Sequence, residues 1–172
     1  MFMKGTLTLS NKWDIRFLQL AEHIAGWSKD PSKKIGAVAV GEKGQILAQG
    51  YNGFPRGIED NIARYDNREE KYKLVVHAEM NVIYNASYNG VSLNGSTLYV
   101  YGLPVCSDCA KGIIQVGIKR VVMNKAEGEP FGVPLRWKKS WENTQQMFKE
   151  SGVSYDFAST RKTHGIHDTE IA

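Results

Sequence analysis

The sequence predicts a single α/β domain of three layers, in which helices cover both faces of a five-stranded mixed sheet. Strand-like segments alternate with helix-like segments after one opening hairpin, which is typical of a mixed, mostly parallel sheet between two helical layers. The chain has 172 residues, of which 42% are apolar, and this suits one domain with its own core. We expect residues 13–157 to form the core and residues 158–172 to be a flexible tail.

The first part of the pattern contains a helix and a hairpin. Between residues 13 and 27, apolar side chains recur at three- and four-residue steps, as on one face of a helix: Trp13, Phe17, Leu20, Ile24 and Trp27. Residues 35–40 form an apolar run typical of a buried strand, and 45–51 follow it after a tight turn at 42–44. The polar stretch 52–73 is long for a loop, which indicates a functional or partly helical segment.

The second part alternates regularly between helices and strands. Three helices are expected, each with a glycine directly or closely after its end, where the left-handed conformation stops a helix: 77–89, 107–116 and 139–151. Each is followed by a short apolar strand: 97–101, 119–123 and 153–157.

Composition and charge exclude several classes of protein. Lys and Arg total 22 against 18 for Asp and Glu, and a net charge of +4 is too small and too scattered for a duplex-binding surface. No run approaches the roughly 18 apolar residues of a membrane span, and no signal-peptide core stands near the start. We therefore expect a cytoplasmic protein without nucleic-acid or membrane partners.

The two cysteines of the chain, Cys106 and Cys109, stand three residues apart. A disulfide-stapled secreted fold is excluded, because one such short loop would stabilise almost nothing. A redox pair, half of a metal site and two inert core residues all remain possible for the pair alone.

His77 and Glu79 change this balance. The His77-x-Glu79 motif and the Cys106-x-x-Cys109 motif are each expected at the start of a helix that follows a strand. The N-termini of these two helices can therefore point into one crevice at the edge of the sheet. One imidazole and two thiolates would give Zn²⁺ three protein ligands and an open fourth position, which marks a catalytic site. Alone, His77 reads as a core histidine and Glu79 as a solvated helix-start residue. Together with the cysteines they indicate catalytic zinc, with Glu79 beside the metal as a proton carrier.

These motifs resemble those of a known family. His77-x-Glu79 with Cys106-x-x-Cys109 is similar to the signature of the zinc-dependent nucleobase deaminases. Segments 30–38 and 50–57 resemble the deoxycytidylate (dCMP) deaminase branch, and the likeness covers roughly residues 13–157.

One detail of the cysteine motif departs from the family. In its members proline directly precedes the first cysteine, whereas Val105 here separates Pro104 from Cys106. This variant looks most like phage or marine bacterial members, so a phage-encoded chain would act in the host cytoplasm.

The resemblance implies a cytidine-deaminase-like fold and a hydrolase acting on a C–N bond of a cyclic amidine. Its reaction would be hydrolytic deamination of dCMP to dUMP and ammonia by zinc-activated hydroxide, supplying dUMP for thymidylate synthesis. Glu79 would protonate N3 and then pass a proton to the leaving amine. The free N–H of Ala78 at the helix start would bind the pyrimidine O2, and Asn52 the sugar hydroxyl, although in Asn52-Gly53 an asparagine also suits a plain turn.

The 5′-phosphate requires cationic or N–H donors. The candidates are Ser28 and Lys29, which leave the first helix, and Arg56; each is also an ordinary loop residue.

The family further implies a homohexamer activated by dCTP and inhibited by dTTP, with Mg²⁺ accompanying these triphosphates. No motif assigns regulatory residues. The chain has no cysteine to spare for a second, structural zinc, so one ion per chain is expected.

Two other classes of function remain as alternatives. Another deaminase would act on free cytidine, tRNA adenosine or single-stranded nucleic acid, and the last would need a basic groove with stacking aromatics. A noncatalytic zinc-supported binding module would need a fourth protein ligand and no Glu79.

Overall fold

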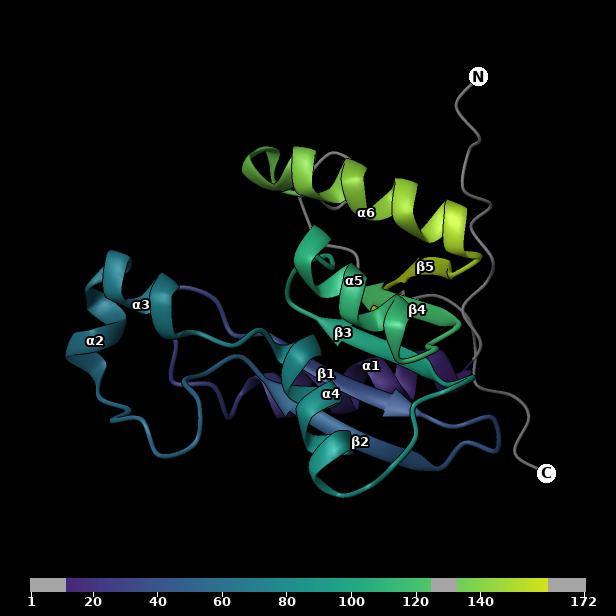
Figure 1. Ribbon diagram of the computed structural model, residues 1–172, viewed down its shortest axis with the longest axis horizontal. Helices are drawn as coiled ribbons and strands as arrows, with labels where there is room; N and C mark the ends of the chain where they lie inside the picture. Colours follow the sequence, from purple (N-terminus) through teal and green to yellow (C-terminus); the bar gives the residue numbers. More distant parts are fainter. Residues whose placement is uncertain (1–11, 125–132, 161–172) are drawn as a thin grey trace, which may run out of the picture.

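The computed structural model describes residues 12–124 and 133–160, which form a mixed five-stranded sheet between helical layers (Figure 1). The strands are β1 (Gly36–Val40), β2 (Ile46–Tyr51), β3 (Thr97–Tyr101), β4 (Arg120–Asn124) and β5 (Ser154–Ala158), in the order β2-β1-β3-β4-β5. Strand β1 is antiparallel to both of its neighbours, whereas β3, β4 and β5 are parallel. The predicted mixed sheet is confirmed, but its two kinds of pairing are equal in number because β1 runs against two strands.

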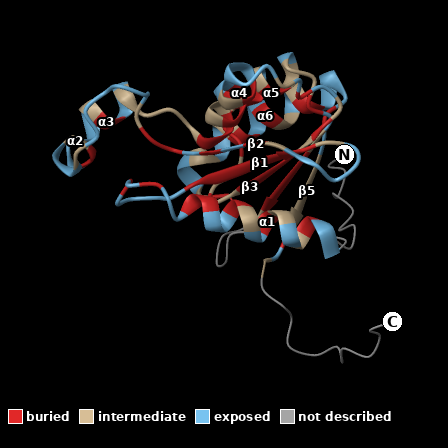
Figure 2. Ribbon diagram, turned by 90° about the horizontal axis from the view of Figure 1, so that it is seen from below, coloured by how far each residue is buried: buried red, intermediate tan, exposed pale blue. Residues whose placement is uncertain are grey.

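Helices cover both faces of this sheet. They are α1 (Lys12–Ala25), α4 (Ala78–Tyr88), α5 (Ser107–Gln115) and α6 (Lys138–Ser151), which a short 3-10 helix, η2 (Leu135–Trp137), precedes. Helix α1 packs on one face, and α4, α5 and α6 lie on the other (Figure 2). The three predicted layers are therefore present.

The alternation of side chains along β1 supplies both cores. Ala37 and Ala39 face the layer of α4 and α5, and Val38 and Val40 face α1. All five residues of β1 are buried, which is expected of a strand covered on both faces. Burial on both faces explains why residues 35–40 form a continuous apolar run in the sequence.

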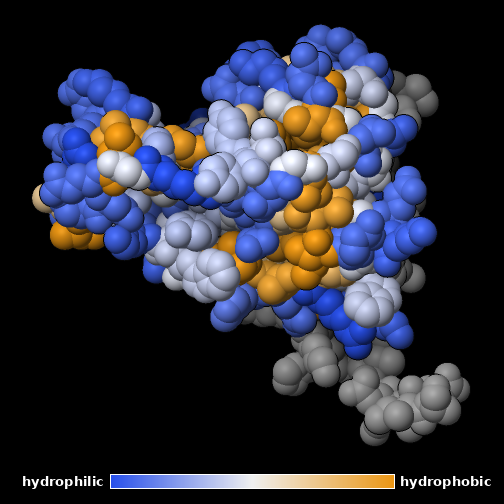
Figure 3. Space-filling model, turned by 60° about the horizontal axis from the view of Figure 1, so that its bottom comes forward, coloured by the Kyte–Doolittle hydropathy of each residue, from blue (hydrophilic) through white to orange (hydrophobic). Residues whose placement is uncertain are grey.

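The polar stretch after β2 forms an arm that projects from the body of the molecule (Figure 1). It carries α2 (Ile62–Asp66) and α3 (Arg68–Leu74), and a two-bond bridge between Gly53 and Val76 closes its base. Asn67 caps α3 by accepting a hydrogen bond from the Glu70 N–H. The surface of the arm is largely hydrophilic, whereas an apolar strip crosses the neighbouring face of the body (Figure 3).

The described residues bear on the expectations about membrane spans and about the C-terminal tail. Within the described ranges, no helix is both long and apolar enough to cross a membrane. The predicted tail, 158–172, lies outside the described residues except for 158–160, and of these Ala158 is the last residue of β5.

Candidate active site

The two sequence motifs meet where α4 and α5 begin. His77 is the N-cap of α4, and Cys106 is the N-cap of α5, where its sulfur accepts the N–H of Cys109. The Nδ1 atom of His77 lies 3.4 Å from the sulfur of Cys106 and 3.4 Å from that of Cys109. Three residues separated by up to 32 positions therefore present their ligand atoms to one point.

The arrangement fits a zinc ion. With Zn–S bonds near 2.3 Å and Zn–N bonds near 2.1 Å, a tetrahedral ion separates its nitrogen and sulfur ligands by about 3.6 Å. The two observed distances of 3.4 Å are close to this edge. All three ligand atoms lie within 4.8 Å of one another, and in ranges 12–124 and 133–160 they are the one such group of His, Cys, Asp and Glu side chains. Three ligands leave the fourth corner open, as in catalytic zinc sites.

The charges of these side chains are coupled. Hydrogen bonds from Cys109 and His77 lower the pKa of the Cys106 thiol to about 4, and the bond to Cys106 raises the pKa of His77 to about 9. The pKa of Cys109 is raised by its bond to Cys106 and by burial. The lowered pKa of Cys106 favours its thiolate, the form that ligates metals.

Glu79 lies two residues after His77, in the first turn of α4. It is the second residue of α4, its side chain is buried, and burial raises its pKa to about 7. A carboxyl group with a pKa near neutrality can both take and give a proton at physiological pH.

Strand β2 holds α4 in place through Gly50. A Cβ atom at Gly50 would stand 2.7 Å from the Val82 nitrogen and 2.8 Å from the Ala78 carbonyl oxygen, both of the α4 backbone. The bare glycine lets the helix approach the sheet directly, and this close contact positions the turn that carries His77 and Glu79.

A cavity of about 320 Å³ opens onto the cluster. His77, Glu79, Cys106 and Asn52 line its inner part, and the arm supplies one wall. The size and the mixture of polar and apolar lining are those of a small-molecule site.

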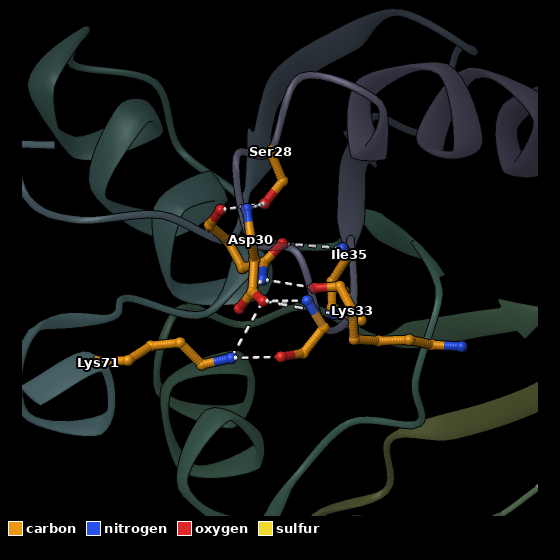
Figure 4. Close-up of polar contacts among 7 residues, drawn as sticks. Ser28, Asp30, Lys33, Ile35 and Lys71 are labelled. Carbon is orange, nitrogen blue, oxygen red and sulfur yellow. Dashed lines mark hydrogen bonds and ion pairs between the residues drawn. The ribbon is translucent and has the colours of Figure 1, made fainter. Parts of the chain in front are cut away.

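Asn52 is the predicted substrate residue that lines this cavity beside Glu79. Its Oδ1 accepts the Ile35 N–H at 2.8 Å, and its Nδ2 donates to the Lys33 carbonyl at 2.9 Å and to Asp30 at 3.4 Å. The close-up shows the polar contacts around the loop that follows α1 (Figure 4). Both amide hydrogens of Asn52 are in use, while Oδ1 keeps one lone pair.

The same loop is fixed by a buried ion pair. Lys71, from α3, lies 3.0 Å from Asp30, and both side chains are at most 9% exposed (Figure 4). Ser28 donates to the Asn52 carbonyl at 2.7 Å and accepts the Asp30 N–H. Ser28 is buried and does not line the cavity.

The other predicted binding residues also lie outside the cavity lining. Lys29 forms an exposed ion pair with Asp60 at 2.9 Å. Arg56 donates to the side chain of Asn85. Ala78 is the buried first residue of α4, where helix N–H groups have no intrahelical partner.

The cavity is also lined by cations that the sequence did not indicate as phosphate ligands: Lys33, Arg68, Lys71 and Arg136. Lys33 lies inside segment 30–38, which resembles the dCMP deaminase branch, and this resemblance could have indicated Lys33 as a binding residue. Arg68 and Arg136 stand in unrelated segments, and only the placement of the arm brings them to one cavity.

Comparisons with known proteins agree with this geometry. A family model described as the cytidine and deoxycytidylate deaminase zinc-binding region matches residues 11–125. An uncharacterized deaminase of Aliivibrio fischeri is 40% identical over 143 residues, which cover 83% of this chain and 91% of that protein. Mouse deoxycytidylate deaminase is 40% identical over 151 residues, covering 84% and 78%.

A solved structure of a dCMP deaminase is also similar to this chain. The crystal structure of the dCMP deaminase of cyanophage S-TIM5 in complex with dCMP and dUMP superposes with a TM-score of 0.65 and 25% identity, covering 88% of this chain and all of that one. With its matching fold and its His77, Cys106 and Cys109 cluster, the chain belongs to the cytidine and deoxycytidylate deaminase family and carries that family's zinc-binding region.

Proposed function

We propose that this chain hydrolyses dCMP to dUMP and ammonia. The observation that carries the proposal is the convergence of the ligand atoms of His77, Cys106 and Cys109, next to a cavity that His77, Cys106 and the buried Glu79 line. The choice of dCMP is supported by the mouse relative, named deoxycytidylate deaminase, and by the cyanophage enzyme, which was crystallised with dCMP and dUMP.

His77, Cys106 and Cys109 would hold the zinc ion. When bound, zinc supplies Lewis-acid activation of a water molecule at neutral pH.

Glu79 would move the protons. Its carboxylate takes one proton from water and delivers it to N3 of the cytosine ring, and a second proton goes by the same group to the departing amine. The C4–N bond breaks, a C4–O bond replaces it, and dCMP and water become dUMP and ammonia. The pKa of about 7 suits a group that must change protonation state twice in each turnover.

Asn52 and Ala78 would orient the substrate. The lone pair that Asn52 Oδ1 keeps can accept a hydrogen bond from a sugar hydroxyl, whereas its amide hydrogens are committed to Lys33 and Asp30. The Ala78 N–H, in the first turn of α4, suits the pyrimidine O2.

The other assignments remain predictions. These are activation by dCTP and inhibition by dTTP with Mg²⁺, a homohexamer, and action in the cytoplasm. None of the sequence-based phosphate candidates Ser28, Lys29 and Arg56 lines the cavity.

The test is ammonia release by the purified chain with dCMP, deoxycytidine, cytidine and a single-stranded oligonucleotide as alternative substrates. We expect dCMP to be used with the highest kcat/KM and dUMP to be its product. Preference for any of the other three substrates would overturn the proposed substrate, and no ammonia from any of them by zinc-loaded protein would favour the noncatalytic module. Repeating the assay with dCTP and dTTP tests regulation.

A further inference from the structure

The cavity has a buried reactive end and an exposed mouth. Glu79 and Cys106 are at most 9% exposed, whereas Lys33, Arg68 and Arg136, which line the same cavity, are exposed. A ligand whose reacting group reaches Glu79 would extend toward the exposed part of the cavity, whose lining includes these three cations.

The three cations come from three separate segments. Lys33 lies in the loop after α1, Arg68 is the first residue of α3 on the arm, and Arg136 belongs to η2. The arm and the beginning of α6, which follows η2, lie at the same side of the sheet (Figure 1). The exposed mouth of the cavity is therefore formed by segments that lie far apart in the sequence.

Ion pairing distinguishes these three cations from neighbouring ones. Among the described residues, Lys33, Arg68 and Arg136 form no ion pair within 4.0 Å. Other cations of the arm and its surroundings are compensated, as in Lys73 with Glu69 at 2.8 Å and Lys71 with Asp30 at 3.0 Å. The carboxylate of Asp66 also lines the cavity and offsets part of the charge. The mouth nevertheless keeps an excess of positive charge.

Each arginine lies against an aromatic ring of the cavity wall. The guanidinium carbon of Arg68 is 5.4 Å from the centre of the Tyr72 ring, and that of Arg136 is 5.8 Å from the centre of the Trp137 ring. Both rings line the cavity. A cation–π contact restrains a guanidinium without neutralising it, and its N–H groups remain free for an oxyanion.

We propose that Arg68 and Arg136, with Lys33 beside them, bind the 5′-phosphate of dCMP and so select the nucleotide over the nucleoside. This inference rests on the proposed function and makes it more specific. Paired guanidinium groups match the geometry of a phosphate, because each can donate two parallel hydrogen bonds to it. Lys29 and Arg56, the sequence-based candidates, do not line the cavity, and Lys29 is already compensated by Asp60.

The experiment compares Arg68→Gln and Arg136→Gln with wild type. We expect each variant to lower kcat/KM for dCMP by about 10- to 100-fold, the range for a lost hydrogen bond to a charged group. Values of kcat/KM for deoxycytidine, which has no phosphate, should change by less than about twofold. Equilibrium binding of dUMP, measured by calorimetry, should weaken by the same factor as dCMP turnover, and Arg68→Lys should restore part of the loss.

Matched controls remove a charge nearby. Lys73→Gln lies on the same helix as Arg68, and Lys139→Gln lies near Arg136 at the start of α6; both side chains are exposed and outside the cavity lining. We expect both controls to behave as wild type. An equal loss of kcat/KM for dCMP in the two control variants would show that long-range charge causes the effect, and it would overturn the phosphate assignment.

Three outcomes separate this inference from the proposed function. If wild type does not deaminate dCMP, the proposed function itself fails. If wild type deaminates dCMP but both arginine variants still prefer it over deoxycytidine by the wild-type factor, only the phosphate assignment fails. If a variant does not fold, inorganic phosphate provides a second measurement on wild type: it must compete with dUMP, and failure to compete would contradict a phosphate-binding mouth.

Discussion

Replacing Gly50 with alanine tests how β2 positions the start of α4. The added Cβ would stand 2.7 Å from the Val82 nitrogen, about 0.7 Å inside the 3.4 Å at which ordinary contacts begin. Its next neighbours, the Ala78 carbonyl oxygen at 2.8 Å and the Asn81 carbonyl carbon at 2.9 Å, also belong to the backbone of α4. No side chain can rotate away, so the helix or the strand must move.

This displacement has a cost in stability and in activity. Overpacking of a core typically costs about 1–3 kcal/mol, and we expect this loss in the free energy of unfolding. At the Ala78 carbonyl oxygen, 2.8 Å from the new Cβ, the required shift is about 0.6 Å, which also exceeds the ~0.2 Å tolerance of a metal-ligand distance at the neighbouring His77. Because a misplacement of about 1 Å can cost about 100-fold in rate, we expect kcat/KM for dCMP to fall by about 10- to 100-fold.

The assay combines urea denaturation, zinc analysis and dCMP turnover. Gly53→Ala is the matched control, since the nearest atom to its new Cβ would be 3.7 Å away and the same methyl group is added. Its stability should change by less than about 0.5 kcal/mol. Wild-type stability, zinc content and turnover in Gly50→Ala would refute the idea that this contact positions the helix.

Three further perturbations test the site and its support. Glu79→Gln should keep its zinc and lose about 10²- to 10⁴-fold in ammonia release, since the amide carries no transferable proton; near-normal turnover would remove Glu79 from the mechanism. Cys106→Ser should lower the zinc content of the purified chain, and a chelator should abolish wild-type turnover until zinc is returned; undiminished zinc in the variant would show that the ligand set is wrong. Lys71→Met should cost about 3–5 kcal/mol in urea denaturation, because Asp30 stays buried without its partner, and adding Asp30→Asn should recover part of this loss; unchanged stability would contradict a supporting ion pair.

The elements were predictable where local chemistry decides them. Helix α6 ends where Gly152 adopts φ +78, and the glycine in the sequence already indicated that end. Strands β4 and β5 each begin one residue later than predicted, at Arg120 and Ser154. Their limits follow pairing with neighbours, Thr97 with Arg120 and Arg120 with Ser154, which no local pattern contains.

The arm marks the limit of prediction from sequence. Its polar composition indicated a long, partly helical segment, but nothing local indicated that Lys71 would be buried against Asp30, 41 positions away. The phosphate candidates differ for the same reason. Lys29 and Arg56 are sequence-based candidates because they are cations, one just after the first helix and one in segment 50–57, whereas Arg68 and Arg136 line one cavity because the arm and η2 both contribute to it.

The sequence by itself determined the class of fold and the set of ligand residue types, because periodicity, helix stops and metal-ligand chemistry are properties of short segments. Tertiary structure alone decided that His77 Nδ1 stands 3.4 Å from both sulfurs, that Glu79 is buried beside them, and which cations surround the mouth. Distances and burial depend on how distant segments pack, and charge at a surface depends on which carboxylates lie within reach.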